Sequence, residues 1–212
     1  MAVIRDLNQG KITKETAVSL FSSLKLLEEG KTEEALAGLV KTIEISPNYA
    51  RPYNILGVVY TSQGETDKGA RYFEKAIEIN PGYSDAYYNL AAAQEALSRP
   101  DEALRNYKKS IELEPDSLDA LTHTAAFCAS LGRYDEAIGY YRGALKIAPG
   151  EPEIYYNLAL VYFMSDQLAK FRDNLLKARE LYQRKGDALG LEKVSVYMNK
   201  MKEIENKFKQ AK

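Results

Sequence analysis

The chain has 212 residues, of which 45% are hydrophobic and 28% charged, a composition typical of a folded protein with one or two domains or one repeat array. Its 29 basic residues nearly balance its 30 acidic residues, and the net charge of −1 removes the long-range attraction to nucleic acid or anionic lipid. The single cysteine, Cys128, excludes an internal disulfide, and no stretch approaches the ~18 apolar residues that a membrane span needs.

Residues 1–15 form a short segment ahead of the first predicted helix pair. The segment carries the apolar residues Val3, Ile4, Leu7 and Ile12. The helix that follows places Leu20, Leu24 and Leu27 away from its own core face, and such an apolar end patch usually marks an interface. Two occupants fit: residues 1–12 fold back over Leu20 and Leu24, or a partner or second copy docks there.

A period of 34 residues runs through most of the chain. Prolines recur at this spacing in turn-like sequences, at Pro47, Pro81, Pro115 and Pro149. Gly30, Gly64, Ser98 and Gly132 recur between them. Because a helix usually ends before proline, each period predicts two helices and two turns. The repeats span residues 16–183, as 16–49, 50–83, 84–117, 118–151 and 152–183.

Small and bulky residues align in columns when the repeats are superposed. Small residues fill the eighth place (Ser23, Gly57, Ala91, Ala125, Ala159), the twentieth (Ala35, Gly69, Ala103, Ala137) and the twenty-seventh (Thr42, Ala76, Ser110, Ala144, Ala178). Bulky residues fill the twenty-fourth (Leu39, Phe73, Tyr107, Tyr141, Leu175). Two helices approach closely only where one offers a small side chain, and a large neighbour then fills the adjacent space.

In these columns the chain resembles the tetratricopeptide-repeat (TPR) family, most clearly over residues 51–81 and 119–149. The resemblance implies an all-α fold: a right-handed α-solenoid of about five helix-turn-helix repeats whose first helices line a concave groove. Each helix pair buries too little apolar surface to stand alone, so the pairs stack and share a core.

Helical periodicity divides each first helix into a core face, at places 4, 7, 8 and 11, and an opposite face directed at the groove. The candidate partner-binding residues on this groove-facing set are Arg51, Asn54, Tyr88, Asn89, Glu95, Thr122, His123, Tyr156, Asn157, Leu160 and Phe163. Chaperone-binding relatives clamp a C-terminal carboxylate with Lys and Arg pairs, which are missing here because Arg51 is the only basic residue in the set.

The sixth place of successive first helices holds Asn89, His123 and Asn157. An amide offers both a donor and an acceptor, so a ladder of amides can pair with the backbone of an extended peptide, as in family members that bind peptides along the groove. Asparagine is also common at this place in the family generally. A contact role and a filler role both remain open.

The C-terminal end departs from the repeat pattern. The fifth repeat has Asp166 where glycine is usual, and its second helix is expected to end near Gly186. Asp187 then fits the N-cap of a last helix over residues 187–209. One face of this helix carries Leu191, Val194, Met198, Met201, Ile204 and Phe208. We expect it to cap the open edge of the last repeat; its six lysines after Gly190 make a membrane-surface role the alternative.

The sequence offers no catalytic, cofactor-binding or metal-binding motif. His123, the only histidine, lies five residues before Cys128 on one helix, roughly 140° away, so the two cannot share a metal. Acidic pairs such as Glu33–Glu34 open second helices, where carboxylates offset the helix dipole. We expect a protein that is not an enzyme and binds no cofactor.

The leading functional prediction is a scaffold that binds a peptide or helix of a partner protein in its groove. The mildly acidic, partly apolar groove suits an amphipathic segment of neutral to basic charge. One alternative is a self-assembling homo-oligomer whose terminal segment docks in a neighbour's groove, and another is a regulatory module of a larger enzyme complex. We expect a cytoplasmic protein without nucleic-acid or membrane contact, although a chain trimmed of a signal or anchor would read the same.

Overall fold

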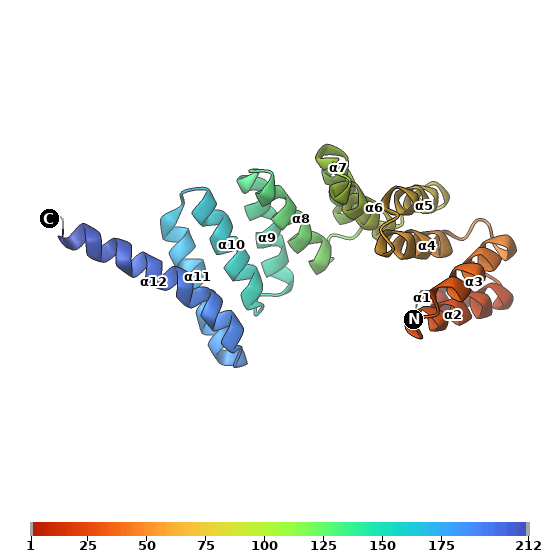
Figure 1. Ribbon diagram of the computed structural model, residues 1–212, viewed down its shortest axis with the longest axis horizontal. Coiled ribbons are helices and arrows are strands. Elements are labelled where there is room, and N and C mark those ends of the chain that lie inside the picture. Colours follow the sequence, from red (N-terminus) through yellow and green to blue (C-terminus); the bar gives the residue numbers. More distant parts are fainter. Residues whose placement is uncertain (1, 211–212) are drawn as a thin grey trace. The chain divides into compact units, whose positions relative to one another are not determined.

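The computed structural model describes the backbone of residues 2–210 and the side chains of residues 3–200. Over this range the chain forms twelve α-helices and no strand (Figure 1), which confirms the predicted all-α class. The helices are α1 Ala2–Asn8, α2 Lys14–Glu28, α3 Thr32–Ile45, α4 Ala50–Ser62, α5 Thr66–Ile79, α6 Ser84–Ala96, α7 Pro100–Leu113, α8 Leu118–Ser130, α9 Tyr134–Ile147, α10 Pro152–Met164, α11 Leu168–Lys185 and α12 Ala188–Gln210.

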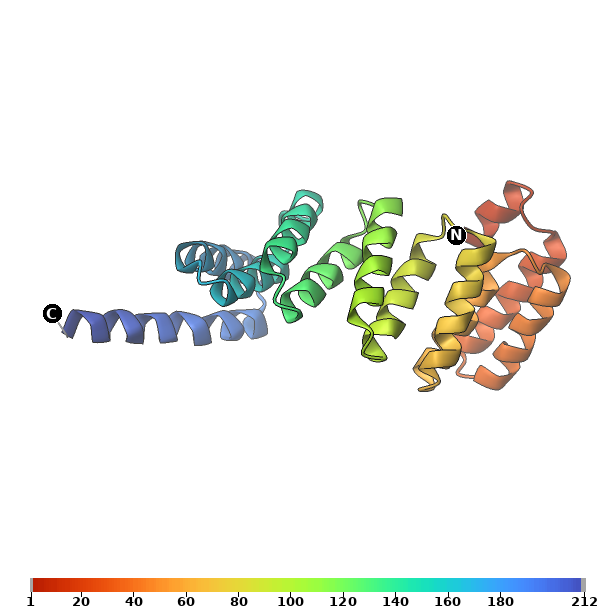
Figure 2. The ribbon, with the colours of Figure 1, turned by 90° about the horizontal axis from the view of Figure 1, so that it is seen from above.

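The chain divides into two compact units, Met1–Pro115 and Asp116–Lys212. In the first unit, the hairpins α2–α3, α4–α5 and α6–α7 stack in chain order, and α1 lies against α2 (Figure 2). In the second unit, the hairpins α8–α9 and α10–α11 stack in the same way, and α12 packs against α11. Five helical hairpins therefore make up the repeat part of the fold, and the further helix α12 follows them in the chain.

The turn inside each hairpin uses one residue in the left-handed region of backbone space. Gly30, Gly64 and Gly132 have φ angles of 75°, 85° and 72°. Ser98 and Asp166 occupy the matching places with φ angles of 58° and 57°, although a residue with a side chain costs roughly 1 kcal/mol there. The turn geometry is thus kept even where the sequence departs from glycine.

The predicted columns of small and bulky residues form the core of both units. Every residue of the eighth, twentieth, twenty-fourth and twenty-seventh places is buried. The close approach is visible at Gly57, because a Cβ atom added there would lie 2.4 Å from Cε1 of the buried Phe73 ring. The pairing of small and large residues therefore sets how closely the two helices of a hairpin pack.

The end of α11 and the start of α12 follow the sequence prediction. Gly186 closes α11 with a φ angle of 67°. Asp187 caps α12, since its Oδ1 accepts a hydrogen bond from the backbone N–H of Gly190 at 2.9 Å. The cap satisfies one of the free N–H groups at the helix start and fixes the direction of α12.

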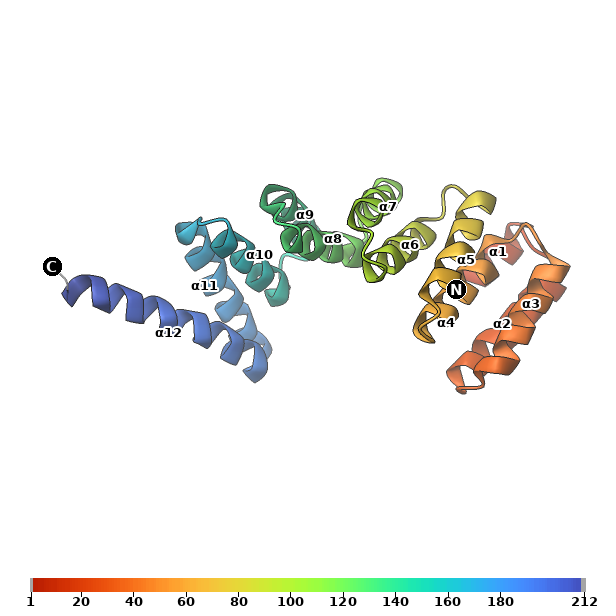
Figure 3. The same cartoon turned by 45° about the horizontal axis from the view of Figure 1, so that its top comes forward.

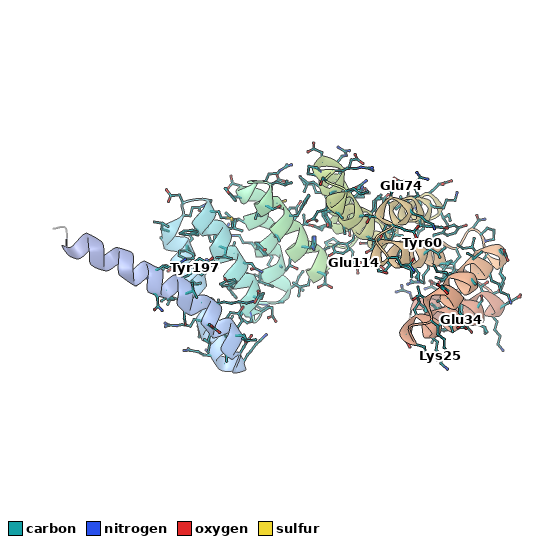
Figure 4. The ribbon with its side chains drawn as sticks, in the orientation of Figure 1. Lys25, Glu34, Tyr60, Glu74, Glu114 and Tyr197 are labelled. Atoms are coloured by element: carbon teal, nitrogen blue, oxygen red, sulfur yellow. The ribbon has the colours of Figure 1, made fainter. Side chains whose placement is uncertain are left out.

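The first half of α12 covers part of the last hairpin. Val194 is fully buried, and Leu191 and Met198 are half-buried. Tyr197 (labelled in Figure 4) lies edge-on to three aromatic rings, with centroid distances of 6.2 Å to Tyr156, 6.4 Å to Phe163 and 6.0 Å to Phe171. The side chains of Met201, Ile204 and Phe208, also predicted for this face, lie outside the described residues.

Candidate partner-binding site

The first helices α4 and α10 each have a buried face and an opposite face that carries exposed side chains. In α4, Leu56 is fully buried, while Val58 on the opposite face is 46% exposed. In α10, Leu158 is buried, while Phe163 is 50% exposed. Helices α8 and α10 lie side by side in the second unit (Figure 3), so their exposed faces form one surface there.

In the first unit, the sixth-place amide of α6 bonds within the protein. Asn89 donates from Nδ2 to Oδ1 of Asn54 over 3.0 Å, and Asn54 is only 7% exposed. This hydrogen bond joins the first helices of two adjacent hairpins. Asn54 therefore has a structural role, because it is buried and its acceptor is in use, and its contact with a partner stays an untested prediction.

Two further predicted residues of α6 contact the bulky Tyr107 of α7. The ring centroids of Tyr88 and Tyr107 lie 5.6 Å apart, and the angle between the two ring planes is 60°. Glu95 accepts a hydrogen bond from the Tyr107 hydroxyl at 2.8 Å. Burial, followed by this bond to Glu95, raises the pKa of Tyr107 well above its usual value, so the hydroxyl remains a donor. Tyr88 and Glu95 remain half-exposed beside this contact.

Arg51 lies at the start of α4 within a cluster of ionisable side chains. Its Nε is 3.7 Å from Oδ2 of Asp6 on α1, and its guanidinium carbon lies 5.7 Å from the centre of the Tyr83 ring. Tyr49 donates its hydroxyl to the same Asp6 oxygen over 2.8 Å. Burial, together with this hydrogen bond, raises the pKa of Tyr49 to about 12, so the hydroxyl is a donor at neutral pH.

A cleft of about 810 Å³ adjoins this cluster and lies entirely within the first unit. The starts of α4 and α6 border it, with Arg51 and Asp85 among the lining side chains. Arg5 and Lys11, on either side of the turn after α1, also line it. The cleft is thus ringed by charges of both signs.

The predicted residues of the second unit lie on α8 and α10. The Thr122 hydroxyl forms a hydrogen bond within its own helix, where it donates to the carbonyl oxygen of Leu118 over 2.9 Å. Tyr156 and Phe163 contact Tyr197 of α12, which covers part of their surface. The remaining members, His123, Asn157 and Leu160, are half-buried on the same face. The exposed part of this surface is therefore bounded on one side by α12.

The apolar end patch predicted on the first hairpin is covered by the chain's own N-terminal segment. Leu20 is fully buried in a cluster with Val3 and Ile12, and Leu24 packs against that cluster. Leu27 is half-buried. The fold-back alternative is the one the structure shows, and Leu20 lies in the core beneath the N-terminal segment.

Three family models, each described as a tetratricopeptide repeat, match residues 49–114, 88–152 and 129–191. Together they cover residues 49–191 without a gap. The chain belongs to the tetratricopeptide-repeat family. No curated protein matches its sequence.

Solved TPR structures share this fold at low sequence identity. A crystal structure of the MamA protein is 22% identical, with a TM-score of 0.72, covering 82% of this chain and 94% of that one. YrrB, described as a TPR protein with an unusual peptide-binding site, is 22% identical with a TM-score of 0.70, covering 94% and 98%. A MamA fragment from Desulfovibrio magneticus RS-1 is 19% identical with a TM-score of 0.71, covering 83% and 99%.

The sequence interpretation missed the part that Asp6, Tyr49 and Tyr83 play around Arg51. The 34-residue period could have pointed to Tyr49 and Tyr83, because each stands two residues after a turn proline, Pro47 or Pro81. Asp6 has no such signal, since it lies outside the repeats. Its position follows only from the way α1 folds back.

Among the described residues, no cluster of three or more His, Cys, Asp or Glu side chains could hold a metal ion. In the same part, no helix is long and apolar enough to cross a lipid bilayer.

Proposed function

We propose that this chain is a non-catalytic scaffold that binds a peptide or helix of a partner protein on the exposed face of its first helices. The observation that carries the proposal is the apolar surface left on that face in the second unit. Phe163 is 50% exposed and Met164 54% exposed, beside the half-buried Leu160. Apolar side chains grouped on one face of a folded protein usually serve an interface.

The similar protein YrrB supports the proposal, because it is described as a TPR protein with a peptide-binding site. The polar members of the same face fit a particular ligand chemistry. Asp119 at the start of α8 is exposed and adds a negative charge to this face. A partner segment with an apolar stripe and a neutral to basic charge would complement this combination.

The self-assembly alternative needs residues 1–12 to occupy a neighbouring copy. Val3 and Ile12 are instead buried against the first hairpin of their own chain. This intramolecular packing favours a partner of different sequence.

Replacing His123 and Asn157 with alanine should weaken peptide binding at least tenfold while leaving the melting temperature nearly unchanged. The probes are peptides selected from a phage-displayed library of random dodecapeptides on the full chain, with affinities measured by isothermal titration calorimetry. A tenfold loss corresponds to about 1.4 kcal/mol, the size expected for lost hydrogen bonds at a partly desolvated contact.

The matched control is Lys146→Ala, which removes an exposed side chain from the second helix α9. Its affinity should stay within twofold of the unchanged chain. If the selected peptides bind the His123→Ala/Asn157→Ala variant as tightly as the unchanged chain, the first-helix face is not the binding surface.

A further inference from the structure

The short helix α1 contacts Arg51 through its Asp6 side chain, and Arg51 is the one basic residue of the groove-facing set. The Asp6 side chain is only 10% exposed and places Oδ2 3.7 Å from Arg51 Nε. The same oxygen accepts the Tyr49 hydroxyl at 2.8 Å. A carboxylate supplied by the chain itself therefore occupies the position that an acidic ligand group would take.

The contact between Asp6 and Arg51 leaves the arginine incompletely paired. Arg51 Nε is buried and has no hydrogen-bond acceptor among the described residues. A guanidinium group can instead form two parallel hydrogen bonds, each near 2.8 Å, with one carboxylate. A ligand carboxylate placed closer to Arg51 than Asp6 is could accept a hydrogen bond from Nε, and Asp6 of α1 does not accept this bond.

Only a few side chains of the helix α1 pack against the rest of the first unit. It has seven residues, and helices shorter than about twelve residues are marginal without tertiary support. Val3 is buried and Leu7 half-buried, while Ile4 is 50% exposed. Gly10, with a φ angle of 68°, forms the turn that follows, and Ile12 beyond it is buried in a cluster that contains Val3 and also Leu20 of α2. Helix α1 can therefore leave its site while the chain stays anchored at Ile12.

The surroundings leave room for a segment longer than α1. The cleft of about 810 Å³ is lined by Asp6, by residues at the starts of α4 and α6, and by Glu114. Asp85 and Glu114 also line the cleft, and their carboxylates would favour a basic or neutral extension of the ligand.

We propose that the surface beneath α1 is a docking site for an amphipathic helix of a partner protein, and that α1 is its internal occupant. The sequence of α1 gives the chemistry of the ligand: aliphatic residues at positions i and i+4, as at Val3 and Leu7, with an acidic residue at i+3, as at Asp6. The partner's carboxylate pairs with Arg51 and accepts the Tyr49 hydroxyl. Displacement of α1 by the partner opens the site.

The inference rests on the proposed function, because Arg51 belongs to the groove-facing set. It can nevertheless fail separately, since the His123→Ala/Asn157→Ala experiment concerns α8 and α10 of the second unit. Peptide binding that depends on those two residues would stand even if α1 were never displaced.

The test uses a labelled, amidated peptide with the sequence of residues 2–11 and measures its binding to the full-length chain by fluorescence anisotropy. Asp6→Asn should bind the peptide at least tenfold more tightly than the unchanged chain, because the internal competitor loses its ion pair. Adding Arg51→Ala to Asp6→Asn should reverse the gain, and so should replacing the aspartate of the peptide with asparagine.

Leu7→Ala provides a second route, because it loosens α1 without changing a charge, and it should also increase peptide binding. Ile4→Ala is the matched control on the exposed side of α1 and should leave the affinity unchanged. Circular dichroism melts confirm that each variant is folded. The proposal is overturned if neither Asp6→Asn nor Leu7→Ala increases binding, or if binding to Asp6→Asn survives Arg51→Ala.

Discussion

Replacing Gly69 with alanine destabilises the first unit by about 2 kcal/mol, measured as a lower urea midpoint and melting temperature. A Cβ atom at Gly69 would lie 2.7 Å from the backbone oxygen of Gly57 and 2.2 Å from Oγ1 of Thr61. Thr61 can rotate, but the Gly57 oxygen belongs to α4 and moves only with the helix. The free-energy cost of moving α4 away from α5 exceeds the gain of about 1 kcal/mol that alanine brings to a helix interior.

The matched control is Gly139→Ala in α9. Gly139 is exposed, and an added Cβ meets no atom within 4 Å, so only the helix propensity changes. We expect this variant to be more stable than the unchanged chain by about 0.5–1 kcal/mol. Equal stabilisation by Gly69→Ala and Gly139→Ala would contradict the close approach of α4 and α5.

Replacing Val194 with aspartate destabilises the second unit by about 3 kcal/mol or releases α12 from it. Val194 is fully buried, so the new carboxylate would lose its hydration without gaining a partner. Loss of α12 also removes Tyr197 from Tyr156 and Phe171. Limited trypsin digestion should then cut at Lys193 and Lys200 at least tenfold faster, and the melting temperature should fall.

Val196→Asp provides the control, because it introduces the same charge two residues further along α12 at a side chain that is 48% exposed. Its effect should stay within about 0.5 kcal/mol. A similar loss of stability in both variants would show that α12 has no preferred buried face, and the capping role would then be withdrawn.

The repeat architecture could be predicted from sequence because the same physical constraint recurs in every period. The column that pairs Gly57 with Phe73 recurs as Ala91 with Tyr107, and a close helix contact needs one small and one large residue at each step. The end of α11 at Gly186 and the cap at Asp187 were predictable for a local reason, since both depend on residues within one turn.

The candidate site was less predictable because it depends on contacts between residues far apart in the chain. Helical periodicity places Asn54 on the groove-facing side of α4. Its burial depends on Asn89 of the neighbouring hairpin, which donates a hydrogen bond to it. The pairing of Asp6 with Arg51 lies outside the 34-residue period, so no column reveals it. The sequence left the occupant of Leu20 open because residues 1–12 follow no repeat pattern, and the structure shows that their fold-back buries it.

The most direct test of the scaffold function is site-specific photo-crosslinking with a selected dodecapeptide. A benzoylphenylalanine replaces Ala126 on the exposed face of α8 in one variant and Gly139 on α9 in another; both positions are exposed. We expect the peptide to crosslink to the chain through position 126 and not through position 139. Crosslinking through position 139 alone, or equally through both, would contradict binding on the first-helix face.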